Sequence, residues 1–152
     1  KVKDSGVQFI WQTGKYYSEE ISLRLSEYAP VPNLHVTDFI SSMDNAYAVA
    51  DLVISRAGAS SISELCLLKK PSILVPSPNV AEDHQTKNAM ALVNKGAAEI
   101  VRDSEAVARG MQEAVALAED KERLATLKTN IAKLAIDDSA ERVVREIEKL
   151  IK

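Results

Sequence analysis

The chain contains few cysteines and aromatic residues, no excess of positive charge and no long apolar run, and each of these features excludes a class of protein. Its 152 residues include a single cysteine, Cys66, which excludes a disulfide framework and indicates a reducing compartment such as the cytosol. Aromatic residues make up 5% of the chain and its net charge is −3, so neither base-stacking platforms nor a basic nucleic-acid face is expected. No signal peptide or long apolar run is present, so we expect any membrane contact to be peripheral or made by another part of a longer protein.

The remaining composition is that of an ordinary globular protein. Hydrophobic residues make up 46% and charged residues 27%, and a chain of 152 residues suits one domain with a substantial core. The first residues, which include no methionine, lead directly into a predicted strand. We interpret this start as that of an excised fragment.

Short apolar runs alternate with segments of helical periodicity. Strands are predicted over residues 7–12, 34–36, 51–55, 71–75 and 98–101, with helices over 18–28, 43–50, 60–68 and 85–94 between them and three more helices after residue 103. This alternation predicts an α/β fold, a Rossmann-like parallel sheet with helices on both faces. Ligands bind such folds beyond the carboxyl ends of the strands, where we expect three polar loops to converge: 37–43, 55–61 and 76–85.

The most informative segment is 51–64, an apolar strand followed by a turn of small residues and a helix start. Gly58 and Ala59 allow the backbone to approach a ligand closely. Ser60 and Ser61 lie at the predicted helix N-terminus, where unpaired N–H groups attract anions and phosphate above all. Glu64, one turn further on, is placed to accept hydrogen bonds from a ribose diol. Alternatively, Ser61 and Glu64 form a capping box that satisfies each other's backbone donors.

These loops together resemble the C-terminal domain of the MurG family of glycosyltransferases. The resemblance is specific from about Phe39 to Ala98. The shared motifs, in chain order, are Ile40-x-x-Met43, Ala50-Asp51-Leu-Val-Ile-Ser-Arg56-Ala-Gly58-Ala-Ser, Glu64, Lys70-Pro71-Ser-Ile-Leu-Val-Pro76, Asp83-His84-Gln85-x-x-Asn88-Ala89 and Gly96-Ala97-Ala98. The family has the GT-B architecture, two Rossmann-like domains facing a cleft. The resemblance implies that residues 1–152 are the UDP-sugar-binding C-terminal half of such an enzyme.

The resemblance also implies roles for the nucleotide-binding residues. The backbone of Ile40 would read the edge of uracil with Met43 packed nearby, although both residues could equally be ordinary core. The diphosphate would receive hydrogen bonds from backbone and hydroxyl donors of Ala57, Gly58, Ala59, Ser60 and Ser61. Glu64 would bind the ribose hydroxyls, because two carboxylate oxygens suit a vicinal diol.

Three further residues complete the implied site. His84 and Gln85 would contact the hydroxyls of N-acetylglucosamine. Arg56 would either balance the charge of the leaving diphosphate or act as a structural hydrogen-bond donor behind the loop. His35 is the only other histidine and no acidic pair has metal-ligand spacing, so we expect neither a metal nor a cofactor.

As a whole, the resemblance implies an inverting N-acetylglucosaminyltransferase of peptidoglycan synthesis at the cytoplasmic face of the bacterial membrane. UDP-N-acetylglucosamine would be the donor and a lipid-linked muramyl-pentapeptide the acceptor. The acceptor site, the general base and the membrane contact would belong to an N-terminal domain outside this chain, so we expect the chain alone to be inactive. The alternatives are a UDP-sugar epimerase of GT-B fold, a non-catalytic donor-binding subunit of a two-subunit transferase, and an α/β interaction module without a ligand.

Overall fold

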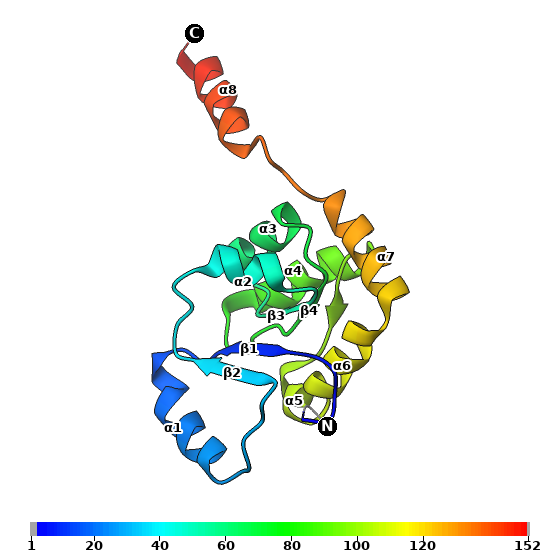
Figure 1. The fold of residues 1–152 in the computed structure, drawn as a ribbon. Coiled ribbons are helices and arrows are strands. Elements are labelled where there is room, and N and C mark those ends of the chain that lie inside the picture. Colours follow the sequence, from blue (N-terminus) through cyan, green and yellow to red (C-terminus); the bar gives the residue numbers. More distant parts are fainter. Residues whose placement is uncertain (1–2, 152) are drawn as a thin grey trace.

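A computed structural model describes residues 3–151 of the chain and alternates strands with helices over its first two thirds (Figure 1). The predicted strands and the helices between them are all present, with ends shifted by at most three residues. The elements up to the last strand are β1 (Phe9–Gln12), α1 (Lys15–Ser26), β2 (Leu34–Thr37), α2 (Met43–Val49), β3 (Val53–Ser55), α3 (Ala59–Leu67), β4 (Ser72–Leu74), the 3₁₀ turn η1 (Ala81–Asp83), α4 (His84–Val93) and β5 (Glu99–Ile100).

The C-terminal third is helical, as predicted, but its first helix is interrupted. It comprises α5 (Asp103–Glu105), the π-helical turn η2 (Ala106–Gly110) and α6 (Met111–Glu119), and is followed by α7 (Lys121–Ala132) and α8 (Ser139–Ile151). Val107 lies in the π turn and is 98% exposed. A π turn adds a residue to the helical repeat, so the apolar spacing read from the sequence loses its register there.

All paired strands are parallel, and they form two sheets rather than one. The first sheet has the order β1-β2 and the second the order β3-β4-β5. Backbone hydrogen bonds continue past the ends of the paired strands within each sheet. Thr13 N–H, after β1, donates to the Thr37 carbonyl of β2, and Val75 N–H, after β4, donates to the Ser55 carbonyl of β3. The alternation of strands with helices predicts that the strands are parallel, but it does not specify which strands are adjacent.

The core covers both faces of the second sheet. On one face Leu74 of β4 packs with Leu65 of α3 and Leu92 of α4. On the other face Ile73 packs with Leu117 of α6 and Leu127 of α7. Strand β4 is buried throughout, as expected of the middle strand of a parallel sheet that is covered on both faces. The α/β class with helices on both faces is thereby confirmed.

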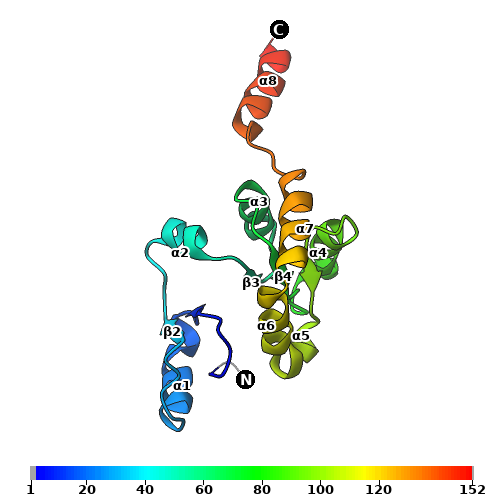
Figure 2. The ribbon, with the colours of Figure 1, turned by 45° about the vertical axis from the view of Figure 1, so that its right-hand side comes forward.

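Helix α8 lies away from this core. Figures 1 and 2 both show it projecting from the end of α7 on a short connection. None of its residues is buried, and Val143, Ile147 and Leu150 are exposed. Within residues 3–151, no helix has the length and apolar character needed to cross a membrane.

Gly96 ends α4 and provides a test of the fold. Its backbone has φ +61°, and its N–H donates to the Val93 carbonyl while Ala97 N–H donates to the Leu92 carbonyl, which is a Schellman motif. A Cβ at Gly96 would lie 3.2 Å from Asn130 Nδ2 of α7. We expect Gly96→Ala to lower the free energy of unfolding by about 1–2 kcal/mol, because an L side chain is strained in the left-handed region.

Chemical denaturation measures this change, and Gly6→Ala is the matched control. Gly6 has no heavy atom within 4 Å of an added Cβ, and its φ lies outside the left-handed region. Equal stability of the Gly96→Ala and Gly6→Ala variants would contradict the assignment of Gly96 as the helix terminator.

Candidate functional site

Helix α3 begins directly after strand β3 and exposes its first turn. Gly58 is the N-cap and Ile62 N–H donates to the Gly58 carbonyl at 3.0 Å, so the N–H groups of residues 59–61 precede the first intrahelical bond. Ala59 and Ser60 are exposed and Ser61 is half-buried. The positive end of the helix dipole therefore opens to solvent at the carboxyl edge of the sheet, as the sequence predicts.

The capping-box alternative for Ser61 and Glu64 is wrong. A capping box needs serine at the N-cap and glutamate at the third helical position. Here the N-cap is Gly58, and Ser61 itself occupies the third helical position. Glu64 consequently lies in the second turn, beyond reach of the cap, and its exposed side chain is available for another role.

Gly58 is not required by the geometry of the fold. Its φ is −66°, which any residue adopts, and an added Cβ would meet Ser61 Oγ at an ordinary 3.8 Å. The residue therefore differs from Gly96, where both backbone and packing need glycine. What glycine provides at position 58 is open space in front of the first turn of α3.

Arg56 holds the loop 55–61 against the end of strand β4. Its Nη1 donates to the Val75 carbonyl at 3.3 Å and to the Pro76 carbonyl at 3.4 Å, and it forms an ion pair with Asp103 of α5. Of the two roles predicted for Arg56, the structure contains the structural one behind the loop. A contact between Arg56 and a diphosphate stays a prediction.

The start of α4 is joined to the same loop. Asn88 Nδ2 donates to the Ala57 carbonyl at 3.2 Å, and Ala57 is completely buried. Gln85 Oε1 accepts from Ser77 N–H at 2.9 Å, which leaves the Gln85 amide nitrogen available as a donor. The loops 55–61 and 76–85 thus converge, as the sequence predicts.

His84 lies on a strained turn beside Gln85. Glu82 and Asp83 have φ of +51° and +55°, a left-handed conformation that is uncommon for residues other than glycine. The exposed imidazole Nε2 of His84 is 3.7 Å from a carboxylate oxygen of Glu82. Backbone strain of this kind concentrates at ligand-binding turns, which is consistent with the predicted sugar contacts of His84 and Gln85.

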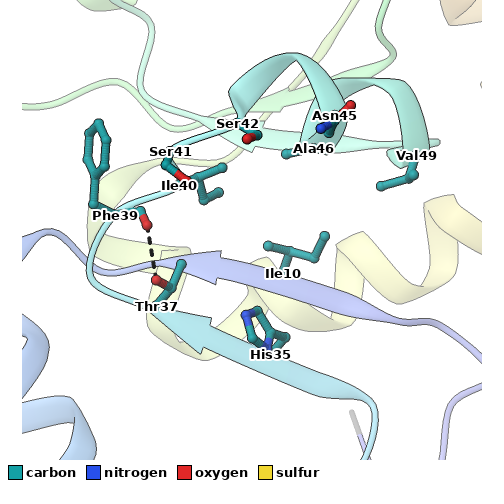
Figure 3. A pocket seen from close by; sticks show the side chains of 10 residues that line it. All are labelled: Ile10, His35, Thr37, Phe39, Ile40, Ser41, Ser42, Asn45, Ala46 and Val49. Carbon is teal, nitrogen blue, oxygen red and sulfur yellow. Dashed lines mark hydrogen bonds between the residues drawn. The ribbon is translucent and has the colours of Figure 1, made fainter.

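Ile40 lies with the first sheet instead, and Met43 is the exposed first residue of α2. Ile40 borders a cavity of about 420 Å³ between the strands β1 and β2 and helix α2, where Ile10 and His35 face Ala46 and Val49 (Figure 3). Ile40 N–H donates to Gln12 Oε1 at 2.8 Å, so Gln12 occupies the backbone donor predicted to read uracil. Figure 2 shows β1 and β2 standing apart from β3 and β4. The loop 37–43 is therefore joined to β1, and it does not converge with the loops 55–61 and 76–85.

Tyr47 of α2 connects this part of the chain to α3. Its hydroxyl donates to Glu64 Oε2 at 3.2 Å, and its ring packs against the core. Burial raises the pKa of the Tyr47 phenol, and the negative charge of Glu64 and the hydrogen bond to it raise the pKa further. The phenol therefore keeps its proton and acts as a donor to Glu64 near neutral pH.

Comparison with protein families identifies the family of this domain. Residues 1–143 match the profile of the glycosyltransferase family 28 C-terminal domain. The chain belongs to this family. The glycosyltransferase resemblance inferred from the loops is thereby confirmed.

Relatives within the glycosyltransferases agree with this assignment. The chain is 59% identical over 150 residues to the UDP-N-acetylglucosamine–N-acetylmuramyl-(pentapeptide) pyrophosphoryl-undecaprenol N-acetylglucosamine transferase of Phocaeicola vulgatus, covering 99% of this chain and 40% of that protein. It is 57% identical to the protein of the same name in Bacteroides thetaiotaomicron, covering 97% of this chain and 40% of the relative. The chain thus spans about 40% of the length of the curated relatives it matches.

Solved glycosyltransferase structures share the fold. MurG of Acinetobacter baumannii superposes with a TM-score of 0.83 at 28% identity, over 97% of this chain and 45% of that chain. The glycotransferase of kitacinnamycin superposes with a TM-score of 0.62 at 20% identity, over 91% of this chain and 34% of that chain, which shows likeness of fold alone.

Sequence reasoning about this family 28 domain missed Tyr47, Gln12 and Asp103. Each makes its contact across elements: Tyr47 with Glu64, Gln12 with Ile40 and Asp103 with Arg56. Periodicity places Tyr47 on a short helix but gives no reason to pair it with a residue on the next helix. The available signal was a tyrosine on a short helix beside a predicted ligand loop, because a phenol that is partly buried needs a hydrogen-bond partner.

The open space at Gly58 generates a prediction for this domain. We expect Gly58→Ala to weaken UDP binding about tenfold or more, because a methyl group would occupy the approach of a diphosphate to the first turn of α3. We expect the free energy of unfolding to change by less than about 1 kcal/mol. Alanine lowers the conformational entropy of the unfolded chain, which stabilises the fold, but it is a poorer N-cap than glycine, which destabilises it. Isothermal titration calorimetry and thermal denaturation measure the two effects.

Gly110→Ala is the matched control, since its added methyl would meet Ala106 Cβ at 4.0 Å, far along the chain from α3. Unchanged UDP affinity in Gly58→Ala would contradict a diphosphate at this helix end.

Proposed function

We propose that this chain is the donor-binding domain of an inverting N-acetylglucosaminyltransferase, and that it holds UDP-N-acetylglucosamine at the start of α3. The observation that carries the proposal is the open first turn of α3, at which Gly58 leaves space and beyond which Glu64 is exposed. Such a helix start binds phosphate oxygens through backbone N–H groups. A carboxylate one turn further along suits the ribose next to that diphosphate.

The remaining donor contacts follow from the placement of the loops. Gln85 and His84, at the start of α4, would face the N-acetylglucosamine hydroxyls, and the loop carrying Ile40 and Met43 would face uracil. In this structure Gln12 Oε1 accepts a hydrogen bond from Ile40 N–H. We infer that uracil either displaces the Gln12 side chain or uses the Ile40 carbonyl instead.

Sugar transfer would proceed by displacement at the anomeric carbon. A hydroxyl oxygen of the acceptor forms a bond to that carbon as the bond to the UDP oxygen breaks, and the bonding electrons leave with the diphosphate. Charge developing on that oxygen is stabilised by N–H groups that are already oriented. The proton of the acceptor hydroxyl would pass to a base outside this chain, and attack from the opposite face inverts the anomeric centre.

The names of the relatives support the acceptor assignment. They describe transfer to an N-acetylmuramyl-(pentapeptide) pyrophosphoryl-undecaprenol, and we propose the same lipid-linked acceptor here. Acceptor binding and a peripheral contact with the cytoplasmic face of the bacterial membrane would belong to residues outside these 152. A GT-B epimerase and a non-catalytic donor subunit would share the same donor contacts, but the relatives' names favour the transferase.

Glu64 provides the test of this proposal. We expect Glu64→Gln to weaken binding of UDP-N-acetylglucosamine roughly tenfold, because hydrogen bonds from ribose to a carboxylate are stronger than those to an amide. The free energy of unfolding should barely change, because Glu64 is exposed. Isothermal titration calorimetry of the chain measures the dissociation constant.

The control is Glu148→Gln, which neutralises an exposed carboxylate on α8. A tenfold effect at Glu64 with none at Glu148 supports the proposal. Equal affinities in both variants would remove Glu64 from the site, and no binding of UDP by the unaltered chain would overturn the proposed function.

A further inference from the structure

The Tyr47–Glu64 hydrogen bond joins a rigid donor to a mobile acceptor. The Tyr47 ring is half-buried and packs against the core beside α3, so its hydroxyl has a fixed position. Glu64 is exposed, with three rotatable side-chain bonds, and in isolation its carboxylate would sample many positions. A hydrogen bond of 3.2 Å to Oε2 selects among them.

The arrangement leaves the carboxylate able to bind a second partner. An ionised carboxylate has about four acceptor positions on its two oxygens, and Tyr47 uses one of them. The remaining positions are sufficient for the two hydroxyl donors of a vicinal diol. Because burial and the charge of Glu64 keep the phenol protonated, the tyrosine donates and does not compete as an acceptor.

We propose that Tyr47 is a positioning residue that pre-orients the Glu64 carboxylate toward the ribose hydroxyls of the bound nucleotide. This inference rests on the proposed function, since it concerns the ribose contact of the same site. Ordering a flexible side chain before the ligand arrives reduces the entropy lost on binding. Tyr47 thereby strengthens selection of ribose over deoxyribose without touching the nucleotide.

Tyr47→Phe tests this role, because it removes the hydroxyl and keeps the ring that packs on the core. Isothermal titration calorimetry would compare UDP with 2′-deoxy-UDP in the unaltered chain and in the variant. We expect UDP to bind about three- to tenfold more weakly to the variant, with 2′-deoxy-UDP changed less than about twofold. The ratio of the two affinities should fall accordingly.

Two controls separate positioning from a general structural effect. Tyr28→Phe removes a hydroxyl from a residue that is 70% exposed and remote from α3 in the sequence, and should leave both affinities unchanged. In a Glu64→Gln background, Tyr47→Phe should change UDP affinity by less than about twofold. The effects of two substitutions are not additive when both act through the same group, here the Glu64 carboxylate.

The outcomes distinguish the inference from the proposed function. An equal loss of affinity for UDP and 2′-deoxy-UDP would mean that Tyr47 supports the fold only, and an unchanged ratio with unchanged affinities would mean that Glu64 needs no orientation. Either result overturns the inference while leaving the donor site in place. Failure of the unaltered chain to bind UDP would overturn the proposed function and this inference with it.

Discussion

The first-turn N–H groups of α3 lie open at the carboxyl end of β3 because the other side of the helix is buried. Leu65 and Cys66 anchor α3 in the core against β4 and α4, which fixes the direction of the helix axis. The buried Ala57 and the N-cap Gly58 then bring the chain out of β3 and into the helix, and a Cβ at position 58 would meet only Ser61 Oγ, at 3.8 Å. The anion-attracting end of the helix is therefore a consequence of core packing, and the donor site proposed here depends on it.

Side-chain contacts from three separate elements hold the segments around the start of α3. Arg56 fastens the loop to the end of β4 and to Asp103, and Asn88 fastens it to α4. Tyr47 reaches Glu64 from α2, on the side of the first sheet. The Arg56–Asp103 pair is exposed, and exposed ion pairs contribute little stability, so we interpret this pair as setting the geometry of the loop more than as stabilising the fold. With this geometry set, the first-turn N–H groups of α3 are oriented in advance and can stabilise negative charge that develops on the diphosphate during transfer.

The sequence predicts most of this architecture where the determining interactions are local. Apolar periodicity locates the strands and the helices between them to within three residues. The N-cap nevertheless lies at Gly58, three residues before Ser61, so Ser61 is not the cap and Glu64 lies beyond reach of it. The division into two sheets and the Tyr47–Glu64 contact both depend on pairing between elements, which no local pattern specifies. The π turn that exposes Val107 likewise arises from packing and not from the repeat.

The most direct measurement of the central claim is the change in backbone amide chemical shifts of the chain on titration with UDP. The account predicts that the largest changes occur at Ala59, Ser60 and Ser61, whose N–H groups would meet the diphosphate, with further changes at Glu64. The chain offers an internal comparison in a cavity of about 250 Å³ bordered by Lys69, Lys70 and Lys128. Changes concentrated around those lysines, with the first turn of α3 unaffected, would contradict the account.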